Sequence, residues 1–247
     1  MIKLETHCHS AGSWCATCGL AGLIERYKDA NYGGVVITNH YSDYEFKKHG
    51  FINQRDYAKY YFELIDKAME LGYKNGLKVF YGVEVKLNER STEYVLYGFT
   101  RDFFLDNANL YEWTQEQLFK IANQNDMLMF QSHPFREGVK AGNPKFMHGA
   151  EYFNGHLHHV NNNALAREFC EKNNLIKLSG TDFHDKDQPI TAGIYIPKSI
   201  KDSFELTKFI KNNQFSLIEE REIYERELVK YKLKEEGRVI NKSDLRE

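Results

Sequence analysis

The chain opens with a short apolar stretch, Ile2-Lys3-Leu4-Glu5-Thr6, that runs directly into His7-Cys8-His9-Ser10. Side chains of a β-strand alternate between its two faces, so residues two apart point the same way. If the strand continues through this stretch, the imidazoles of His7 and His9 project into one space. Two neutral imidazoles aimed at one point form half of a transition-metal site. Taken alone, the His-x-His pattern fits two surface histidines equally well.

The same pattern recurs along the chain, because further apolar runs also end in side chains that can bind a metal. These side chains are His40 after 35–38, Glu84 after 77–83, His133 after 127–132, and Asp182 with His184 after 175–181. In parallel barrels and doubly wound sheets, active sites are built at the C-terminal ends of the strands. The recurrence therefore favours one common site over a set of ordinary loop starts.

The bulk composition restricts the classes of function. The 247 residues, 42% of them hydrophobic, suffice for one large α/β domain or two small ones. The net charge of −2 and the pI near 6.6 argue against binding long nucleic acids through bulk charge. No apolar stretch approaches the ~20 residues of a membrane span, and the N-terminus lacks a signal peptide's apolar segment. We therefore expect a cytoplasmic protein.

Four cysteines are expected to be thiols in a reducing compartment: Cys8, Cys15, Cys18 and Cys170. Cys15 and Cys18 have the Cys-x-x-Cys spacing of redox and zinc sites, but no second pair follows to complete a structural zinc site. We interpret the pair as loop thiols without redox function. Cys15 is also a candidate metal ligand, since it lies in the loop after His9.

Strand-like and helix-like segments alternate along the chain. Besides the runs above, strands are expected at 93–99, 150–153 and 191–197, and helices at 20–30, 56–71, 114–123, 163–172 and 202–212. Thr114 is the expected N-cap of its helix. The alternation favours a mostly parallel sheet that is closed or nearly closed into a barrel. We expect one barrel domain over 1–218 and a charged helical tail over 219–247, packed on the same domain.

Five segments, taken together and in this order, resemble the PHP (polymerase and histidinol phosphatase) superfamily. They are His7-Cys8-His9-Ser10, Ile37-Thr38-Asn39-His40, Gly82-Val83-Glu84, Ser132-His133-Pro134-Phe135-Arg136 and Ser179-Gly180-Thr181-Asp182-Phe183-His184. The resemblance implies a distorted (β/α)7 barrel with a metal cluster at the C-terminal ends of its strands. It also implies hydrolysis of phosphate esters, here of a small phosphorylated metabolite or a nucleotide.

The resemblance also implies a role for each candidate ligand. One metal is matched by His7, His9, Glu84 and Asp182, a second by Glu84 and His133, and a third by His40 and His184. A carboxylate can bridge two cations and imidazoles suit zinc, manganese or iron, so two or three divalent metal ions are expected. A hydroxide held between paired metals would attack phosphorus. Glu84, Asp182 and His184 are then the expected catalytic residues.

Two further residues are candidates for binding the substrate. The planar guanidinium of Arg136 suits bidentate binding of a phosphate. The segment Glu151-Tyr152-Phe153-Asn154 resembles the family's Glu-x-x-Asn strand end, so Asn154 either reaches the site or caps the next element. A histidine cluster follows, expected to line the rim or lie in solvent: His156, His158 and His159.

Three departures from the family pattern keep a second function open. Asn39 stands where the family usually has Asp, and Tyr94 lies near a position where many members have a His, so a ligand of the second metal would be missing. Cys15 lies where some members supply a loop His, and its thiolate could substitute. These departures favour, as an alternative, a metal-binding module that has lost catalysis and serves in regulation or assembly.

A third alternative is a hydrolase of the amidohydrolase type. Such enzymes share the His-x-His pattern after the first strand and an Asp at a late strand. The final Asp182-Phe183-His184 fits the PHP pattern better. The sequence leaves open which metals bind, which substrate is used and how many copies of the chain assemble.

Overall fold

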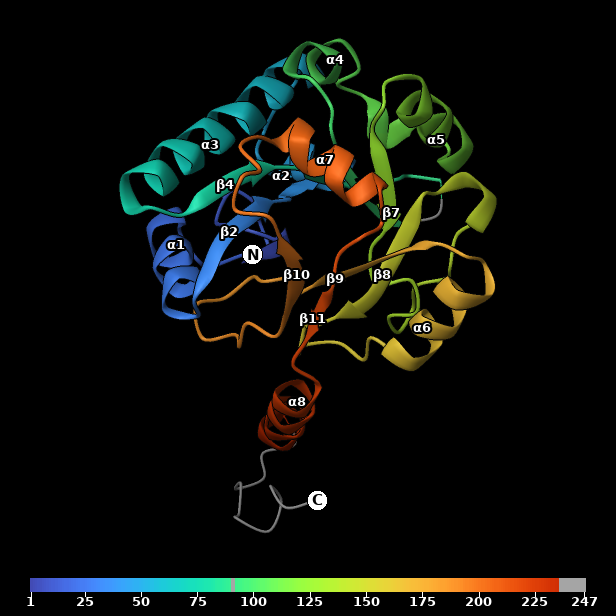
Figure 1. The fold of residues 1–247 in the computed structure, drawn as a ribbon. Helices are drawn as coiled ribbons and strands as arrows, with labels where there is room; N and C mark the ends of the chain where they lie inside the picture. The colour runs from blue at the N-terminus through green and yellow to red at the C-terminus, as the bar shows by residue number, and fades with distance from the viewer. Residues whose placement is uncertain (90–91, 236–247) are drawn as a thin grey trace.

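The strand that carries the His-x-His pattern, β1 (Ile2–Cys8), lies in the middle of a five-stranded sheet. The computed structural model describes residues 1–89 and 92–235. The other strands of this sheet are β2 (Tyr32–Ile37), β4 (Lys78–Tyr81), β10 (Ala192–Ile196) and β11 (Leu217–Glu219). Their order is β11-β10-β1-β2-β4 (Figure 1). β1 pairs in parallel with β2 and antiparallel with β10.

A second sheet has six strands, in the order β3-β5-β6-β7-β8-β9. They are β3 (His40–Tyr41), β5 (Val83–Lys86), β6 (Glu93–Tyr97), β7 (Leu128–Gln131), β8 (Gly149–Asn154) and β9 (Ile176–Gly180). β7, β8 and β9 pair in parallel, whereas β5, β6 and β7 pair antiparallel. The connection between Lys86 and Glu93 is too short for the crossover that a parallel neighbour requires, so β5 and β6 pair antiparallel.

The two sheets meet at two junctions. At the first, the amide of Gly82 donates to the carbonyl of Ile37 at 3.0 Å and that of Glu84 to Asn39 at 3.2 Å, which extends the parallel pairing of β2 and β4 into β3 and β5. At the second, Cys8 pairs with Phe183, so β1 lies beside the end of β9. The α/β class is therefore confirmed. Among the described strands five pairs are parallel and four antiparallel, and they are divided between two sheets. Closure into one distorted (β/α)7 barrel stays a prediction.

The helices lie around the outside of the sheets (Figure 1). They are α1 (Leu20–Asp29), α2 (Asp43–Lys48), α3 (Gln54–Asn75), α4 (Arg101–Asp106), α5 (Gln115–Gln124), α6 (Asn163–Lys172), α7 (Ser203–Lys211) and α8 (Arg221–Glu235), with short 3-10 turns at η1 (Leu110–Glu112) and η2 (Pro144–Phe146). Within the described ranges, none of them combines the length and the apolar character that a membrane crossing demands.

Capping residues explain where two of these helices begin and end. Thr114 starts α5 with the expected cap, since its hydroxyl accepts from the amide of Gln117 at 3.2 Å in a capping box. α3 starts after Asn53, whose side chain accepts two amides of the first turn, and ends at Gly76 with φ of 70°. α3 is therefore longer than the expected 56–71. The sequence did not predict α2, α4, β3 or β11.

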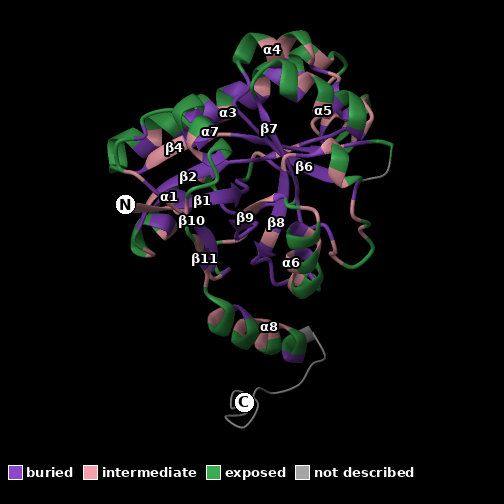
Figure 2. Ribbon diagram, turned by 45° about the vertical axis from the view of Figure 1, so that its right-hand side comes forward, coloured by how far each residue is buried: buried purple, intermediate pink, exposed green. Residues whose placement is uncertain are grey.

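Aromatic rings fill the space between α3 and the sheets. Tyr41 stacks on Tyr57 with ring centroids 4.4 Å apart, and Phe104 meets Tyr41 edge to face at 4.7 Å. Such pairs contribute about 0.5–1.5 kcal/mol beyond the burial of their area. Figure 2 shows this division on α3, with its buried residues toward the sheets and its exposed ones outward. This packing fixes the strands whose ends carry the candidate ligands.

The charged C-terminal helix is present as α8 and contacts the strand β8. Tyr224 is only 7% exposed and its ring lies 5.4 Å from that of Phe153. The amide of Asn161 lies 3.4 Å from the Tyr224 hydroxyl, and the ring of Tyr231 stacks on His158. The expected tail extends to 247, and its part from 236 onward lies outside the described residues.

Candidate metal centre

The imidazoles of His7 and His9 meet at the end of β1. Their Nε2 atoms lie 3.0 Å apart, and both side chains are completely buried. Because a strand brings residues two apart to one face, this convergence follows from the sequence pattern. The two rings supply two nitrogen donors to one point.

Glu84, on β5, lies at the centre of the histidines. Its Oε1 lies 3.3 Å from Nε2 of His7 and 3.4 Å from Nε2 of His133. Its Oε2 lies 3.4 Å from Nε2 of His9 and 2.8 Å from Nδ1 of His40. Each oxygen therefore faces two imidazoles, the arrangement expected of a carboxylate that bridges two cations.

Asp182 and His184 complete the cluster after β9. Oδ1 of Asp182 lies 3.5 Å from Nε2 of His7 and 3.3 Å from Nε2 of His9, and the ring of His184 lies 4.3 Å from that of His9. Nδ1 of His184 lies 2.9 Å from the backbone carbonyl of Asp182. A carbonyl can only accept, so this nitrogen carries the proton and Nε2 offers its lone pair to a metal. All seven residues predicted as ligands thus converge.

Glu151, on β8, supports two of these ligands. Its Oε1 lies 2.7 Å from Nδ1 of His7, and its Oε2 accepts from the backbone amide of His133 at 2.7 Å. A carboxylate beside Nδ1 fixes the tautomer in which Nε2 of His7 is a free donor to a metal. His133 has φ of 30°, a value that costs strain outside glycine. The hydrogen bond from the backbone amide of His133 to Glu151 holds the chain in that turn.

Charged neighbours decide the ionisation of the buried groups. Burial opposes ionisation of Glu84, but His7 and His40 lower its pKa well below the ordinary value. Burial also opposes protonation of His7, but the carboxylate of Glu84 raises the pKa of this imidazole. Burial and the neighbouring His9 lower the pKa of His184, which is therefore neutral. The site combines ionised carboxylates with at least one imidazole suited to metal binding.

The cluster fits divalent cations on a direct structural criterion. Both carboxylate oxygens of Glu84 are buried and have no hydrogen-bond partner among the described residues. The imidazoles at 2.8–3.4 Å compensate this charge only in their protonated form, whereas a cation compensates it with neutral imidazoles as its ligands. A buried charge left without compensation costs several kcal/mol. Donor atoms of His7, His9 and Glu84 all lie within 4.8 Å of one another, as do those of His9, His40 and His184. The centre can therefore hold divalent metal.

The two predicted substrate-binding residues lie at the edge of this cluster. Arg136 pairs through Nη2 with Asp182 and lies 3.2 Å from Oδ1 of Asn154, while its Nε donates to Asn161 at 3.0 Å. The amide of Asn154 donates to Glu151 at 2.8 Å. Asn154 therefore reaches the centre. The contact of either residue with a substrate stays a prediction.

One expectation about the histidine cluster is wrong. His156 is 4% exposed, its Nδ1 lies 2.9 Å from the carbonyl of Asp182, and its ring centroid lies 4.8 Å from that of His184. The chain turns inward here because Gly155 has no side chain, and a Cβ at that position would lie 2.3 Å from Oγ1 of Thr191. His158 and His159 are exposed, as expected.

A second carboxylate near the ligands was not predicted. Glu93 begins β6, and its Oε2 lies 3.4 Å from Nε2 of His133. Its donor atom lies within 4.8 Å of those of His40 and Glu84. Tyr94, one residue later, lies in the aromatic core instead. A charged residue at the start of an otherwise apolar strand is the sequence signal that could have identified Glu93.

A cavity of about 280 Å³ opens onto this side of the centre. It is lined by Cys15, His40, Ser42, Tyr44, Glu45, Lys86 and Glu93. Cys15 is exposed and Cys18 is buried, and both are free thiols. The loop thiol is thus placed beside His40, at the entrance to the centre.

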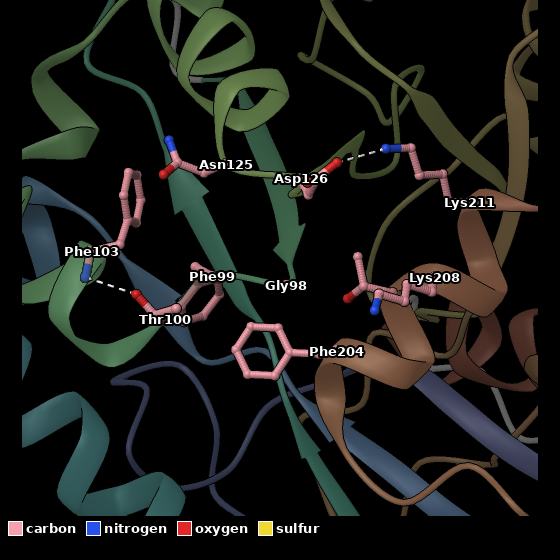
Figure 3. A pocket seen from close by; sticks show the side chains of 10 residues that line it. Gly98, Phe99, Thr100, Phe103, Asn125, Asp126, Phe204, Lys208 and Lys211 are labelled. Atoms are coloured by element: carbon pink, nitrogen blue, oxygen red, sulfur yellow. Dashed lines mark hydrogen bonds and ion pairs between the residues drawn. The ribbon is translucent and has the colours of Figure 1, made fainter.

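Another cavity, of about 230 Å³, lies at the opposite ends of β6 and β7 (Figure 3). Phe99, Phe103 and Phe204 form its apolar part, and Lys211 pairs with Asp126 across its rim at 3.1 Å. Its lining includes none of the predicted ligands. The predicted ligands therefore lie at the other edge of the sheets.

No protein-family model and no curated protein matches the sequence. Solved structures do match the fold. A two-domain protein from Bacteroides vulgatus, described as containing a predicted PHP-like metal-dependent phosphoesterase, matches with a TM-score of 0.65 and 18% identity over 93% of this chain and 69% of its own. PsfC from Pseudomonas syringae matches with a TM-score of 0.64 and 16% identity over 95% of this chain and 97% of its own.

An amidohydrolase from Chromobacterium violaceum, with bound sulfate and no metal, matches more weakly. Its TM-score is 0.52 and its identity 10%, over 88% of this chain and 98% of its own. At such identities the likeness is one of fold. The chain shares its fold with these proteins, and in this chain the fold carries a buried histidine and carboxylate centre able to bind divalent metal.

Proposed function

We propose that the chain belongs to the PHP superfamily, that its two sheets act as one distorted barrel, and that it hydrolyses a phosphate ester of a small molecule in a metal-dependent reaction. The observation that carries this proposal is the position of Glu84. Its buried carboxylate has two oxygens that each face two imidazoles, at distances of 2.8–3.4 Å. The fold shared with a protein described as a metal-dependent phosphoesterase supports the same conclusion.

The proposed centre holds two or three divalent cations (Zn, Mn or Fe). The first would be held by His7, His9, Glu84 and Asp182, the second by Glu84 and His133, and the third by His40 and His184. Cations held there would activate a water and neutralise charge on phosphate oxygens. Glu84, Asp182 and His184 are the proposed catalytic residues, since they surround the point where the reacting atoms would be held.

Other residues of the chain would bind and orient the substrate. The described contacts of Arg136 use Nε and Nη2, which leaves Nη1 to donate to a phosphate oxygen. Asn154 would hold Arg136 and Asp182 in place. The side chains of His7 and His9 are completely buried. The substrate would therefore enter from the cavity beside His40. A cavity of about 280 Å³ suits a small phosphorylated metabolite or a nucleotide better than a polymer.

The alternative of an inactive metal-binding module loses part of its basis. Oδ1 of Asn39 accepts from the backbone amide of Ser10 at 2.7 Å, a bond that an aspartate would also make. Asn39 thus supports the loop after His9 without being a ligand. Glu93 supplies a donor near His133, where Tyr94 suggested a gap. Both observations favour an intact centre.

Phosphate release tests the proposal. The purified protein, supplied with Mn²⁺ or Zn²⁺, is expected to release phosphate from an aryl phosphate or from members of a metabolite panel. His9→Ala and Asp182→Ala should abolish this release, whereas His158→Ala, at an exposed histidine, should leave it unchanged. Full activity in both site variants would refute the assigned centre. Hydrolysis of a lactone or an amide without phosphate release would favour the amidohydrolase alternative, whose fold the chain also matches.

A further inference from the structure

We propose that Glu93 is a further metal ligand of this centre. Together with Glu84 and His133 it would complete the position proposed for the second cation, a set of two carboxylates and one imidazole that suits a cation preferring oxygen donors, such as Mn²⁺. The inference rests on the proposed function for the presence of cations. It goes beyond it because neither the sequence pattern nor the family resemblance pointed to this residue.

The donor atoms converge on one point. Those of His40, Glu84 and Glu93 all lie within 4.8 Å of one another, and Oε2 of Glu93 lies 3.4 Å from Nε2 of His133. Glu84 adds an independent observation, since it is completely buried and neither of its oxygens has a hydrogen-bond partner in the described part of the chain. Two carboxylates this close repel each other unless a cation lies between them.

The hairpin register explains why Glu93 faces the centre. Glu93 pairs with Lys86 across the antiparallel strands β5 and β6, and Glu84 pairs with Val95. Glu84 and Lys86 are two apart, so they share a face of the sheet, and a residue paired with Lys86 shares that face too. Tyr94 points to the opposite face by the same alternation. The register therefore places both carboxylates on one side.

Lys86 gives the two oxygens of Glu93 different roles. Its Nζ lies 3.1 Å from Oε1 of Glu93, whereas Oε2 faces His133. The lysine thus orients the carboxylate with one oxygen toward the centre, as hydrogen-bonded partners of ligating carboxylates commonly do. Glu93 and Lys86 also line the cavity that opens beside His40, so a cation could enter from there.

The donor types indicate which cation this position would take. Glu84 and Glu93 with His133 offer more oxygen than nitrogen donors, whereas His9, His40 and His184 offer only imidazoles. Oxygen donors suit Mn²⁺, while imidazole suits zinc, copper and iron. Replacing the Glu93 carboxylate should therefore affect Mn²⁺ binding more than Zn²⁺ binding.

Metal titration of the full-length, metal-stripped protein tests the inference. Calorimetry and elemental analysis after dialysis are expected to show that Glu93→Gln loses one equivalent of Mn²⁺, or binds it about 10-fold more weakly or worse, while Zn²⁺ binding changes less. Glu93→His should move the preference of the site toward Zn²⁺. Glu93→Asp keeps the charge, but its shorter side chain moves the carboxylate oxygen away from the cation position. It provides a second test if Glu93→Gln does not fold.

Glu45→Gln is the matched control. Glu45 is buried in the same cavity, but its oxygens accept from the backbone amide of Trp14 at 3.1 Å, so Mn²⁺ binding should not change. Unchanged Mn²⁺ stoichiometry and affinity in folded Glu93→Gln and Glu93→Asp would overturn the inference and leave the proposed function standing. Loss of Mn²⁺ in these variants, with no ester hydrolysed by the wild type, would support the inference and refute the function. A wild type that takes up no divalent cation would refute both.

Discussion

Oε1 of Glu151 lies 2.7 Å from Nδ1 of His7, at the buried end of β1. The carboxylate accepts a hydrogen bond from Nδ1–H of the His7 ring, which leaves Nε2 of this ring directed toward the predicted metal position. A carboxylate in this position makes the imidazole a stronger donor. Glu151 would therefore act on a bound metal through His7.

Changing this carboxylate should weaken metal binding without removing a ligand. We expect Glu151→Gln to lower the affinity for one divalent ion by about 10–100-fold, because the amide loses the charge and its single oxygen can accept from Nδ1 of His7 or from the backbone amide of His133, but not from both. Competition with a chelator measures the affinity. Glu171→Gln, an exposed carboxylate that contacts Tyr152, is the control and should have no effect. Equal affinity in Glu151→Gln and wild type would contradict the assigned role.

Arg136 should matter for the reaction through its planar shape. Arg136→Lys keeps a positive charge but loses the fork that pairs with Asp182 and Asn154. We expect kcat/KM for the phosphate ester to fall about 100-fold, or about 2.7 kcal/mol. Steady-state kinetics measure the change. Arg55→Lys, at an exposed ion pair with Asp106, should match the wild type. A similar loss in both variants would argue against a specific role.

His148 should contribute a loss of stability at mildly acidic pH. Burial lowers the pKa of His148 to about 4, and its Nδ1 accepts from the backbone amide of Met129 at 3.0 Å. Between pH 6.5 and 4 the unfolded chain binds a proton that the folded chain does not, so stability decreases as pH falls through this window, by at most about 1.4 kcal/mol per pH unit. Partial exposure of the ring reduces the effect.

Urea unfolding at several pH values checks this dependence. In His148→Asn, an amide oxygen can replace Nδ1 as the acceptor and cannot be protonated in this range. The variant should therefore lose less stability than the wild type between pH 6.5 and 4. Identical pH profiles of the two proteins would show that His148 does not titrate as described.

The aromatic core should be sensitive to loss of Phe104. This ring is fully buried and contacts Tyr41, Tyr61 and Phe99. We expect Phe104→Ala to destabilise the protein by about 3–5 kcal/mol because it leaves a cavity. Chemical denaturation measures the difference. Phe204→Ala removes a ring that is 41% exposed and should cost clearly less.

The sequence predicted the location of the centre because local rules sufficed. Alternation within β1 brought His7 and His9 together, and the ends of parallel strands brought His133 and Asp182 to the same edge. The same rule could not find Glu93, because β6 runs antiparallel. Its first residue, not its last, lies at the shared edge. Strand direction depends on which strands pair, and a local pattern does not contain that information.

The remaining differences have similar causes. His156 was expected at the rim, but its position depends on the path of the chain after β8 and on the close contact that Gly155 allows with Thr191. The antiparallel pairing of β5 with β6 likewise depends on the short connection between them, which leaves no room for a crossover helix. The start of α5 was predicted correctly because Thr114 and its capping box are encoded within one turn.

The contact between α8 and the strand β8 has a practical consequence for the predicted substrate arginine. The side-chain amide of Asn161 donates to the hydroxyl of Tyr224. The oxygen of the same side chain accepts from Nε of Arg136. A shortened chain that ends before Arg221 would uncover the ring of Phe153 and take away one support of that asparagine. Expression designs for this protein should therefore retain α8, even though its sequence reads as a dispensable charged tail.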